Sequence, residues 1–187
     1  MKKSKIIIII LSISLFLNSC ALHYTKQGLE EFSTDASDYG LCRGLIPENF
    51  IEEFSYEKGD FFIAFSEKAP FIATCERVLL YLKYTDDVYL DAKKYAMENL
   101  ILSENCVAVF ENYIFYNNIT PVNFEQDHLD GSRFPRSFVR FAYNDENNTL
   151  LFIGFDVSME LYDEVDSLAN DWGAFLENYY GEFYDFS

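Results

Sequence analysis

Apolar residues recur at every second position in several stretches of the chain, which is the spacing expected of β-strands. The most regular example lies between residues 137 and 157, where two alternating runs flank the polar segment 144–148. Val139, Phe141 and Tyr143 share one face of the first run, and Leu151 and Ile153 share one face of the second. This pattern predicts a β-hairpin.

Other stretches predict further strands. An aromatic and β-branched run at 61–65 follows the break Gly59-Asp60, and apolar runs at 106–110 and 113–116 indicate either a strand or a second hairpin. The segment 71–85 alternates through Val78, Leu80 and Leu82, which favours a strand. A helix remains the alternative, because Ile72, Cys75, Leu79 and Leu82 also recur at helical spacing.

Three segments show helical spacing instead. Residues 47–54 begin with proline and an acid and predict a short helix that buries Phe50, Ile51 and Phe54. Residues 86–99 predict an amphipathic helix with Lys93 and Lys94 pointing outward. The last predicted helix ends near Gly181 and has a continuous apolar stripe of Leu161, Val165, Leu168, Trp172, Phe175 and Tyr179.

Strands interleaved with two or three helices predict an α+β fold, in which helices cover mainly one face of an antiparallel sheet. Residues 40–187 are long enough for a single domain with a sizeable core. Residues 20–39 are polar and mixed, and we interpret them as a tether with a short helical turn at 29–32.

The start of the chain has the pattern of an export signal. Three lysines precede an uncharged run at 6–17, and those twelve residues span only about 18 Å as a helix, too short for a bilayer core of about 30 Å. The sequence Leu17-Asn18-Ser19-Cys20 that follows resembles the lipobox of bacterial lipoproteins.

This resemblance covers only residues 1–20 and implies that residues 1–19 are removed and that Cys20 carries the lipid anchor. Acyl chains there would hold an exported protein on the extracytoplasmic face of a membrane, with the choice of inner or outer membrane open. The alternative is an ordinary signal peptide that is cut nearby, with Cys20 an incidental thiol.

Charge and composition exclude some functions. Removing residues 1–19 takes away three lysines and no acids, so the net charge moves from −17 to −20. Such a surface repels nucleic acid, and no nucleic-acid partner is expected. With 50% hydrophobic and 18% aromatic residues, the chain has the composition of a packed domain rather than a disordered one.

Acylation of Cys20 would leave three cysteines, Cys42, Cys75 and Cys106. They permit one disulfide and a free thiol, or no disulfide at all. The chain contains no C-x-x-C spacing, so we interpret these cysteines as buried structural thiols and expect no metal site or cofactor.

Candidate chemistry is sparse. The only histidines are His23 and His128, and catalytic motifs built on glycine, serine or histidine are absent. Arg133, Arg136 and Arg140 lie close together in an acidic chain and form a candidate docking point for an anion or a partner carboxylate. The alternative is that they pair with acids of the protein itself.

We therefore expect a lipid-anchored cell-envelope protein that is not an enzyme and binds a protein or small ligand. One alternative is a carbohydrate- or peptide-binding module that uses exposed aromatics, for which the tail 179–186 is a candidate unless it packs into the core. Another is an anchored hydrolase that uses carboxylates as catalysts, although 31 acids single out no pair.

Overall fold

The computed structural model describes residues 23–34, 41, 44–69, 73–118, 136–158, 161, 171–182 and 184. The helices and strands, in chain order, are β1 (His23–Gln27), α2 (Leu29–Thr34), α3 (Phe50–Glu53), β2 (Lys58–Ala69), β3 (Ala73–Lys83), α4 (Asp86–Asn99), β4 (Ala108–Phe110), β5 (Tyr113–Asn118), β6 (Ser137–Asn144), β7 (Thr149–Val157) and α6 (Trp172–Tyr180).

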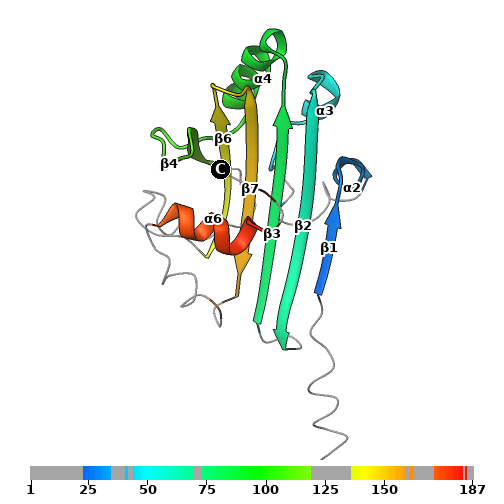
Figure 1. Ribbon diagram of the computed structural model, residues 1–187, viewed down its shortest axis with the longest axis vertical. Helices are drawn as coiled ribbons and strands as arrows, with labels where there is room; N and C mark the ends of the chain where they lie inside the picture. Colours follow the sequence, from blue (N-terminus) through cyan, green and yellow to red (C-terminus); the bar gives the residue numbers. More distant parts are fainter. Residues whose placement is uncertain are drawn as a thin grey trace, which may run out of the picture.

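The strands form one seven-stranded sheet in the order β1-β2-β3-β7-β6-β5-β4 (Figure 1). Every neighbouring pair is antiparallel. After β3 the chain passes through α4 to the far edge of the sheet and returns through β4, β5 and β6, so that β7 pairs with β3. The predicted α+β fold with an antiparallel sheet is confirmed.

The central strands bury both of their faces. In β3, Val78, Leu80 and Leu82 contribute to one apolar cluster, whereas Leu79 and Tyr81 contribute to a second. Neighbouring residues of a strand point to opposite faces, so the two clusters lie on opposite sides of the sheet. This explains why the sequence of β3 reads as a nearly continuous apolar run.

Helices cover both of these faces. The first cluster contains Phe32 of α2, Phe50 of α3 and Tyr89 of α4, while the second contains Phe175 and Tyr180 of α6. Figure 1 shows α6 lying across the near face of the sheet. Helices thus lie on both faces among the described residues, with α2, α3 and α4 on one and α6 on the other, and the expectation that helices cover mainly one face is not established.

The predicted tether is wrong for the residues of β1 and α2. Residues 23–27 form an edge strand in which His23 pairs with Ser66 and Gln27 pairs with Phe62. The expected helical turn is present as α2, with Phe32 buried at 6% exposure. A polar edge strand shows little alternation, because its side chains need not contribute to the core.

The expected break at Gly59-Asp60 is also wrong, because β2 begins at Lys58 and runs through it. Gly59 pairs with Leu82 in the sheet. A Cβ atom at position 59 would come within 2.4 Å of Cδ1 of Leu29, so glycine gives α2 room to pack on the strand.

Several local predictions are confirmed: α4 has the predicted bounds, the segment predicted as a strand forms β3 over Ala73–Lys83 rather than a helix, and the hairpin at 137–157 turns at residues 145–148. The helix predicted at 47–54 is shorter, since α3 spans Phe50–Glu53; Phe50 is buried, and Ile51 and Phe54 are partly buried against the first cluster. Glu111 and Asn112, both at positive φ, close the β4–β5 hairpin.

The last predicted helix is confirmed over the residues of α6. The carboxylate of Asp171 caps it by accepting a hydrogen bond from the N–H of Ala174, 2.9 Å away, and Gly181 ends it. The predicted part at 162–170 lies outside the described residues. No helix in the described part of the chain is long and apolar enough to cross a membrane.

Candidate functional site

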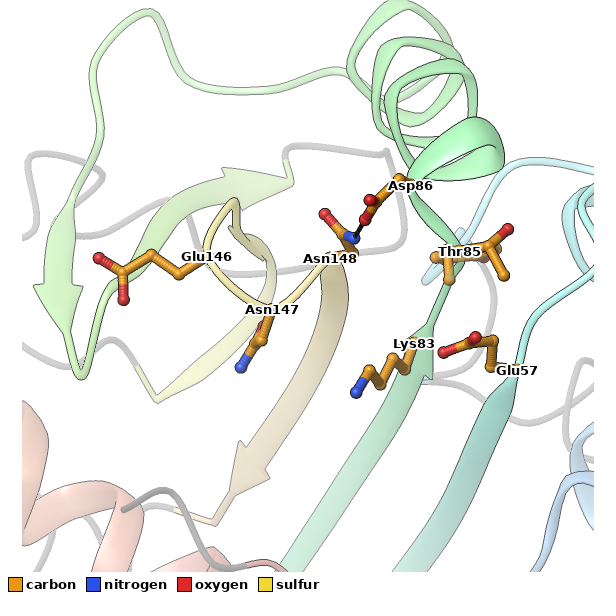
Figure 2. A pocket seen from close by; sticks show the side chains of 8 residues that line it. Glu57, Lys83, Thr85, Asp86, Glu146, Asn147 and Asn148 are labelled. Carbon is orange, nitrogen blue, oxygen red and sulfur yellow. Dashed lines mark hydrogen bonds between the residues drawn. The ribbon is translucent and has the colours of Figure 1, made fainter.

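A polar recess of about 510 Å³ lies at the end of the sheet where β2 begins and β3 ends (Figure 2). It is lined by Glu57, Lys83, Tyr84, Thr85, Asp86, Glu146, Asn147 and Asn148. These residues come from the start of β2, the connection between β3 and α4, and the turn between β6 and β7. We call this site the recess.

Backbone hydrogen bonds hold the parts of the recess together. The N–H of Glu57 donates to the carbonyl of Lys83 over 2.7 Å, and the N–H of Tyr84 donates to the carbonyl of Asn148 over 3.0 Å. The side-chain amide of Asn148 donates to the carboxylate of Asp86, as Figure 2 shows. The β6–β7 turn is therefore fixed to the start of α4.

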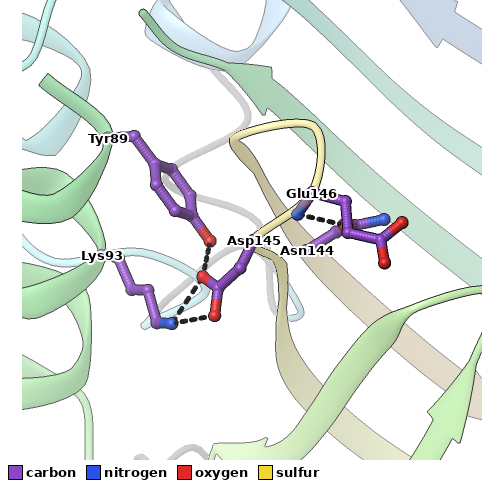
Figure 3. A network of polar contacts seen from close by, with 5 residues as sticks. All are labelled: Tyr89, Lys93, Asn144, Asp145 and Glu146. Carbon is purple, nitrogen blue, oxygen red and sulfur yellow. Dashed lines mark hydrogen bonds and ion pairs between the residues drawn. The ribbon is translucent and has the colours of Figure 1, made fainter. Parts of the chain in front are cut away.

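A second set of contacts fixes the same turn from the other side (Figure 3). Nζ of Lys93 lies 2.6 Å from Oδ1 and 2.9 Å from Oδ2 of Asp145, and the hydroxyl of Tyr89 donates to Oδ1 over 2.5 Å. Within the turn, the N–H of Glu146 donates to Oδ1 of Asn144 over 2.9 Å. We call the Lys93–Asp145–Tyr89 group the latch.

The contacts of the latch shift the pKa values of Asp145 and Tyr89. Partial burial by itself would raise the pKa of Asp145, but the hydrogen bonds from Lys93 and Tyr89 outweigh it and lower that pKa. Burial and the adjacent carboxylate raise the pKa of Tyr89, so this hydroxyl stays protonated and donates. The latch therefore contains one carboxylate that is held in its charged form.

The recess itself carries a negative charge. Glu57, Asp86 and Glu146 bring three carboxylates against the single ammonium of Lys83, so the formal charge of the lining is −3 + 1 = −2. The two asparagines add both donors and acceptors. This lining suits a polar ligand that offers several hydrogen bonds.

Comparison with known proteins finds no matching family model, curated protein or solved structure.

The three candidate arginines do not line the recess. Arg133 lies outside the described residues, as does the segment around His128. Arg136 is half-buried, and its carbonyl accepts a hydrogen bond from the N–H of Val157. A docking role for Arg136 stays a prediction.

Arg140 lies inside the fold at 1% exposure. Its guanidinium carbon is 4.1 Å from the ring centroid of Trp172 and 4.5 Å from that of Phe138, and its Nε donates to Oδ1 of Asn117 over 3.1 Å. Burial lowers the pKa of Arg140 to about 9, which leaves the guanidinium charged at neutral pH. The protein's own rings thus cover the surface that a docking partner would need.

The cysteines divide into two kinds. Cys75 is buried, and burial raises its pKa to about 11, as expected for a structural thiol. Cys106 is exposed, so the interpretation as a buried thiol is wrong for it. Both are free thiols, whereas Cys20 and Cys42 lie outside the described residues.

The aromatic tail packs into the core where the structure describes it. Tyr180 is fully buried and its hydroxyl donates to the carbonyl of Gly154 over 2.7 Å. Tyr184 lies against Tyr81, with ring centroids 5.1 Å apart. These rings are not available as an exposed binding surface.

Sequence reasoning missed the recess and the latch. Their residues are acids and asparagines in short connections, and a chain with 31 acids gives no reason to choose three of them. The expectation that Lys93 points outward is wrong, because its side chain is 17% exposed and binds Asp145. Among the described residues, no cluster of histidine, cysteine or acids is arranged to hold a metal ion.

Proposed function

We propose that this chain is a lipid-anchored cell-envelope protein that binds a polar ligand in the recess, at the end of the domain that points away from the membrane. The position of the recess relative to the start of β1 carries this proposal. The lipid anchor is the one that the lipobox-like segment ending at Cys20 implies.

The register of the sheet supports this orientation. His23 is three positions after Cys20, so a lipid on Cys20 would keep His23 within about 11 Å of the membrane. His23 pairs with Ser66, and β2 runs back from Ser66 to Lys58 over eight residues, or about 26 Å. Glu57 of the recess precedes Lys58, so the recess faces the solvent beyond the anchored end.

The lining of the recess favours binding over catalysis. It contains neither histidine nor cysteine, the side chains that most often act as a base or nucleophile near neutral pH. Its walls are fixed by hydrogen bonds before any ligand arrives, which lowers the entropy lost on binding.

The anchor is tested in bacteria that express the full chain and grow in medium containing an alkyne-bearing fatty acid, which labels acylated proteins. We expect the wild-type protein to be labelled and to sediment with membranes, and Cys20→Ser to remain unlabelled. Labelling of both proteins, or of neither, contradicts the anchor.

The binding role is tested by probing glycan and short-peptide arrays with the exported protein. We expect a ligand class whose binding is lost in the double variant Asp86→Ala/Asn148→Ala. The matched control is Glu104→Ala/Asn105→Ala, which removes an exposed acid and amide outside the recess. Equal binding by the two variants contradicts a role for the recess.

A further inference from the structure

The outer side of α4 exposes large apolar side chains at the same end of the domain as the recess. Leu90 is 67% exposed, Met97 38% and Ile101 57%. Leu90 and Met97 are seven residues apart and therefore share one side of the helix. Ile101 directly follows the C-cap residue Leu100, and we call these three residues the α4 stripe.

The α4 stripe is unusual on this molecule. Only two other large apolar side chains in the described part of the chain are exposed, Tyr56 and Val109. The opposite side of α4 is well packed, with Tyr89, Ala92 and Ala96 buried in the first apolar cluster. The core therefore needs only one side of this helix, and the α4 stripe needs another explanation.

Acidic residues flank the α4 stripe. Asp87, Asp91 and Glu98 are all exposed on the same helix. Lys93 forms an ion pair with Asp145 at 2.6 Å, and Lys94 forms one with Glu98 at 3.9 Å between two exposed side chains, so the charges of Lys94 and Glu98 offset each other. The acids of α4 (Asp86, Asp87, Asp91 and Glu98) still outnumber its two lysines, so the helix that carries the α4 stripe has a formal charge of −2.

This charge decides between possible occupants. A second copy of the chain would bring the same acids against its own α4 stripe, and an anionic lipid surface would be repelled in the same way. A helix with apolar residues on one side and lysine or arginine beside them would complement both the α4 stripe and the acids of α4.

We propose that the α4 stripe docks a basic amphipathic helical segment of a partner protein. This docking is separate from ligand binding in the recess, so either proposal can be wrong without affecting the other. Because α4 begins at Asp86 in the recess, the partner would lie at the solvent-facing end of the domain.

The probe is an immobilised 14-residue peptide of leucine and lysine, with leucines spaced to form one helical face. The exported chain with Cys20→Ser, which carries no acyl group, is passed over it and binding is measured by surface plasmon resonance. We expect binding that Leu90→Gln/Met97→Gln weakens about tenfold or more. The control Val109→Gln, at a residue 65% exposed on β4, should bind like the parent.

Charge is tested with Asp91→Asn/Glu98→Gln, which should weaken binding and reduce its dependence on salt. Three results overturn the proposal: absence of binding, equal binding by the parent and the Leu90→Gln/Met97→Gln variant, or equal losses in that variant and in Val109→Gln. Self-association of the parent that the stripe variant abolishes, or stripe-dependent binding to phosphatidylglycerol vesicles, assigns a different occupant and also overturns it.

Discussion

Lys93 of α4 and Asp145 of the β6–β7 turn form an ion pair in which Nζ lies 2.6 Å and 2.9 Å from the two carboxylate oxygens. Nζ also lies 3.5 Å from the ring centroid of Tyr143. The residues are 52 positions apart, so this contact ties two separate parts of the domain together beside the recess.

Breaking the ion pair should destabilise the domain modestly. Lys93→Met removes the pair and the contact with Tyr143, and we expect a loss of about 1 kcal/mol in the free energy of unfolding. Urea denaturation measures the loss. The control Lys94→Met removes a 3.9 Å pair between exposed side chains and should change stability by less than about 0.5 kcal/mol. Equal losses would contradict a special role for Lys93.

The same contact predicts a dependence on acid. The folded state lowers the pKa of Asp145, so its stabilisation is present above the unfolded-state pKa of about 3.9 and is lost as pH falls through the folded-state value. The stability difference between wild type and Lys93→Met should therefore stay constant from pH 7 to about pH 5 and shrink as pH falls below about 4. Urea denaturation from pH 7 to pH 2 measures it, and a difference that does not shrink at the acid end argues against the ion pair as its source.

Arg140 should be important for stability. Arg140→Ala removes a guanidinium that packs against the rings of Trp172 and Phe138, together with its hydrogen bond to Asn117, and we expect a loss of about 3 kcal/mol in the free energy of unfolding. Trp172 is the only tryptophan, so its fluorescence reports the unfolding directly. Arg136→Ala should cost less than about 1 kcal/mol. Similar losses in both variants would show that the buried packing of Arg140 does not account for the lost stability.

Two buried tyrosines should respond in opposite ways to loss of the hydroxyl. The Tyr84 hydroxyl is buried and has no hydrogen-bond partner among the described residues, so Tyr84→Phe should stabilise by about 1 kcal/mol. Tyr180→Phe leaves the Gly154 carbonyl without its donor and should destabilise by about 1 kcal/mol. Thermal and urea unfolding test both signs, and destabilisation by Tyr84→Phe would reveal a partner for its hydroxyl.

The thiols should react at very different rates. Cys106 is exposed, whereas Cys75 is buried with a raised pKa, so iodoacetamide at pH 8 should modify Cys106 first. Peptide mapping by mass spectrometry distinguishes the two sites. Cys75 should react only when urea unfolds the domain, and fast modification of Cys75 under native conditions would mean that its strand opens.

Much of the fold follows from the sequence, because alternation and helical spacing are local signals. They predict β3, the β6–β7 hairpin, α3 and α4, where apolar side chains enter a core. β1 could not be predicted in this way, since its place depends on pairing with β2 rather than on its own side chains. The packing of α6 on the opposite face likewise depends on tertiary contacts.

The recess could not be predicted from the sequence either, because it also depends on pairing between distant strands. The recess forms because Lys83 pairs with both Lys58 and Thr149, which brings three separated segments to one end of the sheet. For Arg140, closeness in sequence to Arg133 and Arg136 was misleading. β6 places its side chain inside the fold, where the rings of Trp172 and Phe138 cover it.

The pairing of β3 with β7 in the middle of the sheet also constrains how the protein is made. β3 ends at Lys83 and its partner β7 begins only at Thr149, so the sheet stays incomplete until residues 149–157 have emerged. A polypeptide that is threaded through a narrow export channel must remain unfolded during passage. Late closure of the central strands would keep the chain unfolded through most of such a passage, which is compatible with the export proposed above.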